Sequence, residues 1–257
     1  MKRLAVVLLA SMSASGAVAA PPSAADVIDR AIAVHGGKAA LASYPSLEMK
    51  GTTESTSGRG AGRRSDVTIR ERSDGAYRRE STFEFRGRKV TPVEFFDGTA
   101  CKRRFGQTWD DLPIDEAKEG VAHRLPFLLP LAEKDPRVEG EGTEADIACW
   151  TISVADGRDR ATLSFAQDDG RLLGIDYPAT SAEGMGTKKD VRRKLVFRDH
   201  RKVGVLMLPF DVESFEDGTP DSRLRLDTVR VLDAFAPAWI RVPDATRRFI
   251  PPEELSF

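Results

Sequence analysis

The stretch AIAVHGGKAALASYPSLEMKG, residues 31–51, contains the change of pattern on which the fold depends. Before it, Ser23 and Asp26 have the spacing of a weak capping box, and apolar residues then recur at helical spacing. Gly36 and Gly37 interrupt this pattern, since glycine takes the left-handed conformation that ends a helix without steric cost. We therefore predict a helix that starts after Ser23 and ends at the two glycines.

The period changes downstream of the glycines. Residues 38–43 fit a second short helix, which Pro45 closes. From Leu47 onward, apolar and polar side chains alternate, as they do in strands with one dry and one wetter face. The same alternation returns in Val67 and Ile69, in Tyr77, Arg79, Ser81, Phe83 and Phe85, in Trp150 to Val154, in Ala161 to Phe165, in Leu173 to Tyr177, and in Leu224 and Leu226.

Five Asp-Gly pairs separate the alternating segments. Asp-Gly supplies the positive φ angles of tight hairpin turns, and strands joined by such turns form an antiparallel meander. No β-α-β alternation is present, which argues against a parallel sheet. The pairs are Asp74-Gly75, Asp97-Gly98, Asp156-Gly157, Asp169-Gly170 and Asp217-Gly218.

The first twenty residues have the pattern of a secretory signal. Lys2 and Arg3 precede a short apolar run, and small residues follow it. The alternative is a retained anchor helix, although the run is too short to span a bilayer. We expect 1–20 to be a signal peptide and 21–257 to be a single domain.

The charge balance offers no general attraction to nucleic acid. Without Lys2 and Arg3, 37 of the 39 basic residues remain against 40 acidic ones, a net charge of −3. Basic residues still cluster in 59–64, 102–104 and 188–202. These clusters are either solvated strand faces and loops or contacts for anionic lipid head groups or a protein partner.

The chain has two cysteines, Cys101 and Cys149. In an exported protein two thiols favour a disulfide bridge, which we consider for this pair. Without histidines at ligand spacing they do not make a zinc site.

Residues 111–135 break the strand pattern. A helix is possible over 114–124, and an apolar cluster interrupted by Pro126 and Pro130 follows. Prolines argue against a central strand. The segment is either a plug packed on the sheet or a mobile apolar lid over a cavity.

Motifs of catalysis are absent. The sequence lacks G-x-S-x-G and H-E-x-x-H, and His35, His123 and His200 are isolated in the sequence, so we do not expect them to converge in space. We expect no catalytic residue, no metal site and no cofactor. His35 is predicted to lie in the last turn of the first helix, where an imidazole suits the helix C-terminus.

Several segments together resemble a known superfamily. They are AVHGGKAALASYPSLEMKGTT (33–53), VEFFDGTACKRR (93–104), LPFLLPLAEKD (125–135), LVFRDHRKVGVLMLPFDVESFEDG (195–218) and DTVRVLDAFAPAWIRVP (227–243). The chain resembles the periplasmic outer-membrane lipoprotein-sorting-like proteins of the LolA/LolB-like superfamily, in particular the branch with a helix-Gly-Gly opening. The resemblance covers nearly all of residues 21–257, and its motifs are loose.

The resemblance implies a mainly β (α+β) protein, in which one curved antiparallel sheet forms an incomplete barrel with an N-terminal helix and a short helix or loop as a lid. In the carriers of this superfamily the cavity holds lipoprotein acyl chains, which would gain about 0.8 kcal/mol per buried CH₂. The expected cavity and lid residues are Leu125, Phe127, Leu128, Leu131, Phe83 and Phe85.

We therefore expect a monomeric periplasmic protein that holds a lipid or a lipoprotein acyl chain, without an enzymatic activity. One alternative is an envelope interaction or scaffold protein that uses its basic faces to bind a protein partner. Another is a hydrolase, which would need His35, His123 or His200 to meet carboxylates in one pocket.

Overall fold

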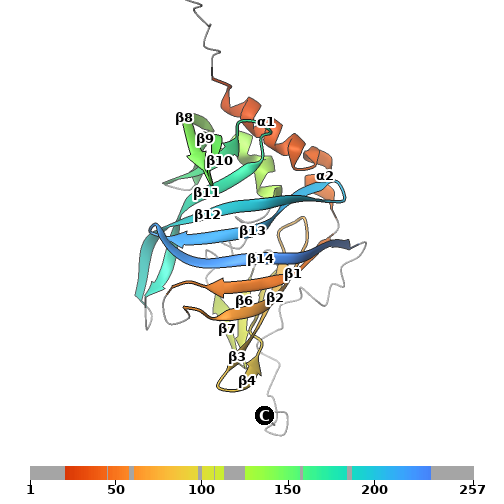
Figure 1. Cartoon of the computed structure of the whole chain (residues 1–257), viewed down its shortest axis with the longest axis vertical. Coiled ribbons are helices and arrows are strands. Elements are labelled where there is room, and N and C mark those ends of the chain that lie inside the picture. The colour runs from red at the N-terminus through yellow and green to blue at the C-terminus, as the bar shows by residue number, and fades with distance from the viewer. Residues whose placement is uncertain are drawn as a thin grey trace, which may run out of the picture.

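The computed structural model describes residues 21–44, 46–57, 61–97, 100–106, 108–112, 125–156, 159–183 and 187–232. The expected signal segment 1–20 and the possible helix 114–124 lie outside these ranges. The described residues form one antiparallel 14-stranded sheet that does not close, accompanied by three short helices (Figure 1). The prediction of a mainly β protein built on an incomplete barrel is confirmed.

The sheet consists of two meanders that meet at a single long-range strand pair. Its order is β7-β6-β5-β3-β2-β1-β14-β13-β12-β11-β10-β9-β8, and β4 pairs with β3. The first and last strands, β1 and β14, join the two meanders. The bounds are β1 Ser46–Ser55, β2 Arg64–Glu71, β3 Tyr77–Phe85, β4 Arg88–Val90, β5 Val93–Phe96, β6 Cys101–Phe105, β7 Thr108–Leu112, β8 Arg137–Glu144, β9 Ile147–Asp156, β10 Asp159–Ala166, β11 Leu172–Glu183, β12 Thr187–Val203, β13 Leu206–Glu216 and β14 Thr219–Leu232.

Helix α1 (Ala24–Val34) begins and ends as predicted. The Ser23 hydroxyl accepts a hydrogen bond from the Asp26 amide, and the Asp26 carboxylate accepts one from the Ser23 amide, both at 3.2 Å. After α1, Gly36 and Gly37 have φ angles of 124° and 84°. Helix α2 (Gly37–Ser43) follows at once, so the two glycines turn the chain from one helix into the next.

The helices pack on one face of the sheet, which we call the inner face. Helix α1, helix α2 and the 3₁₀ helix η2 (Leu125–Glu133) contact one another. Their buried side chains share one apolar core with Leu47 and with alternate residues of β9 to β13, among them Ile152, Leu163 and Leu195. In Figure 1 the helices lie at one end of the molecule and the β3–β4 hairpin at the other.

None of the helices in the described part of the chain is both long and apolar enough to cross a lipid bilayer.

Asp-Gly turns connect strands as expected wherever they are described. Gly75, Gly170 and Gly218 have φ angles of 90°, 83° and 77°. They join β2 to β3, β10 to β11 and β13 to β14. Gly98 and Gly157 lie outside the described residues.

A β-bulge lies in the junction between the two meanders. The register of β1 against β14 shifts between Lys50 and Gly51. A side-chain carbon at Gly51 would lie 1.9 Å from the carbonyl oxygen of Arg225. Only glycine permits this approach, which bends and twists the sheet where its two halves meet.

Candidate functional site

The inner face of β14, β1 and β2 carries an apolar patch that continues the core under the helices. Met49 lies opposite Val229 on β14 and opposite Ile69 on β2, and Leu226 and Val67 flank Gly51. Leu224 continues the row on β14, two residues before Leu226 and opposite Thr53. We call these six residues, Met49, Val67, Ile69, Leu224, Leu226 and Val229, the inner apolar patch.

The inner apolar patch is less completely covered than the core under the helices. Four of its six residues, Met49, Ile69, Leu224 and Val229, are half-buried, whereas Val67 and Leu226 are as buried as core residues such as Leu47. Partly exposed apolar side chains on a curved inner face gain free energy when an apolar ligand covers them. The patch is therefore the part of the inner face best suited to hold such a ligand.

Polar groups border the patch toward β3 and β5 and toward the end of α2. The Tyr77 hydroxyl donates a hydrogen bond to the Glu94 carboxylate. Arg79 donates to the Thr53 hydroxyl at 3.4 Å, and Tyr44 donates to Glu71 at 3.1 Å. An apolar surface with a polar border suits a molecule that has both an apolar and a polar part.

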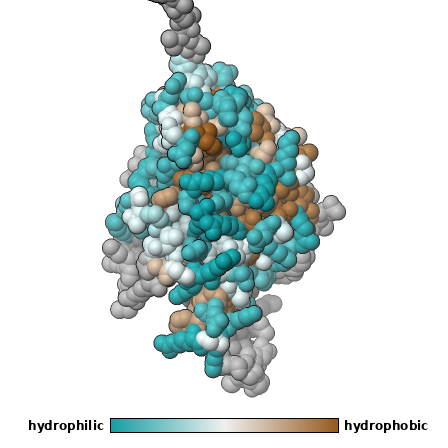
Figure 2. All heavy atoms as spheres, in the orientation of Figure 1, coloured by the Kyte–Doolittle hydropathy of each residue, from teal (hydrophilic) through white to brown (hydrophobic). Residues whose placement is uncertain are grey.

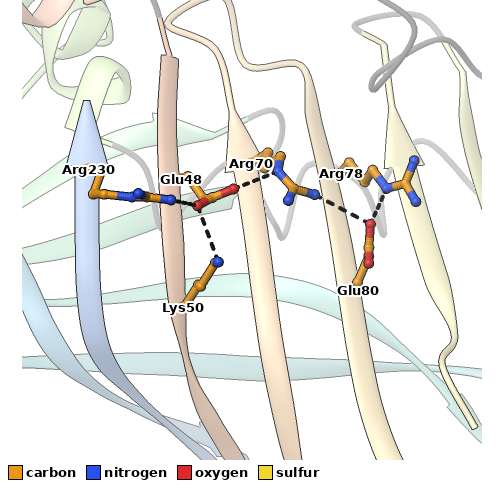
Figure 3. Close-up of polar contacts among 6 residues, drawn as sticks. All are labelled: Glu48, Lys50, Arg70, Arg78, Glu80 and Arg230. Atoms are coloured by element: carbon orange, nitrogen blue, oxygen red, sulfur yellow. Dashed lines mark hydrogen bonds and ion pairs between the residues drawn. The ribbon is translucent and has the colours of Figure 1, made fainter. Parts of the chain in front are cut away.

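The outer face of the same strands is charged. Figure 3 shows Glu48 of β1 between Arg230 of β14 and Arg70 of β2, with Lys50 at 3.5 Å. Arg70 also reaches Glu80 of β3 at 3.5 Å. Since successive side chains of a strand point to opposite faces, Glu48 lies behind Leu47 and Met49.

Glu48 is the centre of this outer network. Its side chain is only 7% exposed. Burial acts to raise the pKa of its carboxyl group, but the hydrogen bonds from Arg230 and Arg70 outweigh that effect and lower the pKa. The carboxylate therefore stays charged and ties β14, β1 and β2 together behind the inner apolar patch.

The residues predicted for a cavity and lid lie in two separate places. Leu128 and Leu131 of η2 are fully buried in the core beside α1 and α2. Leu125 and Phe127 belong to the same helix, and their side chains lie outside the described part. Phe83 is half-buried and Phe85 is exposed, and both lie on the β3–β4 hairpin at the other end of the molecule. The structure does not bring these six residues together, and their binding role stays a prediction.

The inner apolar patch was not predicted as a site. The alternation of Leu47 with Met49 and of Val67 with Ile69 indicated strands with a dry face. Alternation does not say which strands are neighbours, however, and the pairing of β1 with β14 joins residues about 180 positions apart in the sequence.

The disulfide considered for Cys101 and Cys149 is wrong for this structure, which has the two residues as separate thiols. Cys101 lies in a small cluster with Tyr77 and Phe96, and Cys149 lies in another with Ala166 and Leu173. Their strands, β6 and β9, each lie next to an opposite edge strand of the sheet. The sequence could not show this separation.

We expect both thiols to react when the protein is denatured in iodoacetamide without a reductant. Mass spectrometry should then find two carbamidomethyl groups on each chain. In the native protein Cys149 should react slowly, because burial raises the pKa of its thiol. A denatured chain that carries no adduct would contradict this prediction.

Two of the three histidines meet in space, which contradicts the expectation that they remain apart. The ring centroids of His35 and His200 are 6.0 Å apart. The Leu172 amide donates to His35 Nε2 at 3.1 Å, so the His35 proton lies on Nδ1, which donates to the Met207 carbonyl at 2.7 Å. His200 Nε2 donates to the Leu172 carbonyl at 2.9 Å. His123 lies outside the described residues.

His35 holds the end of α1 against β11 and β13, and His200 of β12 packs against it. His35 is fully buried, and desolvation lowers its pKa. It therefore lies at the helix end as a neutral group, which corrects the expected favourable interaction of a charged imidazole with the helix. Both ring nitrogens of His35 are engaged with backbone groups, so neither is available as a general base.

Among the described residues no group of three or more His, Cys, Asp or Glu side chains could hold a metal ion.

The fold defines the class to which this chain is similar, an open antiparallel half-barrel of the LolA type. A LolA superfamily protein from Nitrosomonas europaea superposes with a TM-score of 0.58 at 10% identity, over 86% of this chain and 98% of that chain. A putative outer membrane lipoprotein-sorting protein domain from Vibrio parahaemolyticus gives a TM-score of 0.58 at 7% identity, over 85% and 97%. No protein-family model and no curated protein matches the sequence. The resemblance inferred from the sequence is thus confirmed at the level of the fold.

Proposed function

We propose that the protein is an exported periplasmic carrier that holds a lipid or a lipoprotein acyl chain on the inner apolar patch. The observation that carries this proposal is the row of six apolar side chains on the inner face of β14, β1 and β2, four of which are only half-buried. An acyl chain would gain about 0.8 kcal/mol for each CH₂ that it buries there. The LolA-type fold and the signal pattern of residues 1–20 support the same proposal.

The arrangement favours a carrier over an enzyme. The buried imidazole of His35 binds the backbone at both nitrogens and packs against a second histidine, so it has no nitrogen left to act as a general base. The inner apolar patch, by contrast, presents aliphatic side chains with a border of tyrosine, arginine and glutamate, a combination that suits an amphiphile.

The proposal predicts a bound amphiphile in protein purified from the periplasm. Native mass spectrometry should show the protein with an added mass, and organic extraction should release a lipid or an acylated peptide. An empty protein in both measurements would overturn the proposal and favour the envelope scaffold instead.

The substitution Ile69→Gln should reduce the retained amphiphile several-fold, because it places an amide on the inner apolar patch. The matched control is Thr68→Gln, which introduces the same side chain on the outer face of the same strand and should leave retention unchanged. The melting temperature of each variant shows whether it is folded. Equal retention in the two variants would show that the ligand does not lie on the inner face.

A further inference from the structure

The basic residues of the described chain differ in how far nearby carboxylates neutralise them. In the cluster of residues 188–202, which lies on β12, most cations are paired. Lys189 contacts Asp217 at 2.9 Å and Arg192 contacts Asp176 at 2.5 Å. Four others are paired in the same way: Arg193 with Glu216, Lys194 with Glu144, Arg198 with Glu213, and Arg201 with Asp199. This cluster is a set of ion pairs and leaves little charge for a partner.

The cations around the β3–β4 hairpin are in a different situation. Within the described ranges, no carboxylate forms an ion pair with Arg63, Arg64, Arg86 or Lys89. Arg63 instead lies over the ring of Phe83 at 4.8 Å, and Arg86 lies over the ring of Phe85 at 5.4 Å. We call these four cations and two rings the basic-aromatic tip.

The strand directions place these residues at one end of the sheet. β1 and β3 both run antiparallel to β2, so the turn that follows β1 and the turn that follows β3 leave the sheet at the same end. The neighbouring carboxylates on these strands are Glu84 of β3, Glu54 of β1, which is opposite Arg64, and Asp66 of β2, which is opposite Thr82. With Arg88 of β4 counted as well, five cations against three carboxylates leave an excess of positive charge.

Phe85 makes this end apolar as well as basic. It is 46% exposed, although it is a large apolar residue. In Figure 2 the lower end of the molecule shows an apolar patch between strongly hydrophilic side chains. Arginine and lysine beside an exposed ring form the combination that binds a bilayer interface, with the ring among the acyl chains and the cations on the phosphates.

We propose that the basic-aromatic tip docks the protein on a membrane surface that carries anionic lipid head groups. The membrane is favoured over an acidic protein because the exposed group at the centre of the cations is an aromatic ring at a hairpin turn, which can enter a bilayer without rearrangement of the sheet. The proposal goes beyond amphiphile binding and does not depend on it, since the tip and the inner apolar patch are different surfaces.

Vesicle co-sedimentation tests the proposal with protein purified from the periplasm. Vesicles of equal parts phosphatidylglycerol and phosphatidylcholine should bind the protein, and pure phosphatidylcholine vesicles should bind it at least about tenfold more weakly. The double variant Arg86→Gln, Lys89→Gln should lose about tenfold in affinity for the anionic vesicles. Added salt should weaken the binding of the wild-type protein to the same vesicles. Equal binding to both kinds of vesicle, or binding that the double variant retains, would overturn the proposal.

A second phenylalanine supplies a matched control. Phe105 at the β6–β7 turn is 51% exposed, as much as Phe85. Arg104 of β6 pairs with Val93 of β5, which in turn pairs with Glu80 of β3. Phe105 is therefore level with the residue that follows Glu80, and Phe85 lies four residues, or about 13 Å, further along the strand direction. Phe85→Ser should reduce vesicle binding about tenfold, and Phe105→Ser should reduce it less than twofold.

Equal losses in the two phenylalanine variants would indicate general apolar adhesion and would overturn the tip as the docking site. Binding of the wild-type protein to a polyglutamate peptide but not to anionic vesicles would also overturn it, in favour of an acidic protein partner. None of these outcomes bears on the mass-spectrometric test for a bound amphiphile, so the two proposals can fail separately.

Discussion

Gly51→Ala is expected to lower the free energy of unfolding by at least about 3 kcal/mol. The new methyl carbon would lie 1.9 Å from the Arg225 carbonyl oxygen and 2.8 Å from two further backbone atoms. Backbone atoms of a paired strand cannot move aside as the end of a flexible side chain can. The substitution therefore opens the β1–β14 pair, which is the junction between the two meanders.

Urea denaturation followed by circular dichroism measures this loss as a lower transition midpoint. Gly142→Ala on β8 is the matched control, because a methyl group there would contact only the Thr151 hydroxyl at 3.4 Å and the Cys149 sulfur at 3.6 Å. Its effect should stay below about 1 kcal/mol. If the two variants unfold at the same urea concentration, the junction at Gly51 is not as tight as the structure shows.

The local features of the fold could be predicted because they depend on neighbouring residues. The capping box at Ser23, the end of α1 at the two glycines and the hairpin at Asp217-Gly218 each result from side chains a few positions apart. The alternation of Trp150, Ile152 and Val154 likewise reports the two faces of one strand, and Ile152 and Val154 are indeed buried.

The arrangement of the strands in space could not be predicted in the same way. The pairing of β1 with β14 depends on packing over the whole chain, and it brings Met49 beside Val229. The inner apolar patch exists only because of this pairing. The wrong disulfide has the same cause, since no local pattern shows that Cys101 and Cys149 belong to different clusters.

The meeting of His35 and His200 is another long-range effect, and it determines how stability depends on pH. Both histidines have lowered pKa values. For His200 the causes are burial, then the neighbouring His35 and Arg171, and its pKa falls from 6.5 to about 4. For His35 the first cause is also burial, while Asp169 acts to raise the pKa and Arg171 to lower it.

We expect the protein to lose stability as the pH falls from 7 to 5. In this range the unfolded chain takes up protons on histidines that the folded protein keeps neutral, so protonation favours unfolding. His200 alone accounts for about 2 kcal/mol between these two pH values, and His35 adds to the loss in the same direction. Carboxyl groups with lowered pKa values, such as Glu48, release or bind protons mainly below this range.

The substitution His200→Gln separates the histidine effect from other causes. The glutamine amide can still donate to the Leu172 carbonyl, which His200 Nε2 reaches at 2.9 Å, but it does not titrate. The variant should therefore lose clearly less stability between pH 7 and pH 5 than the wild-type protein, in urea denaturation at each pH. A variant with the wild-type pH dependence would show that His200 does not govern acid stability, whereas the expected flattening would show that the folded protein keeps the His200 imidazole neutral.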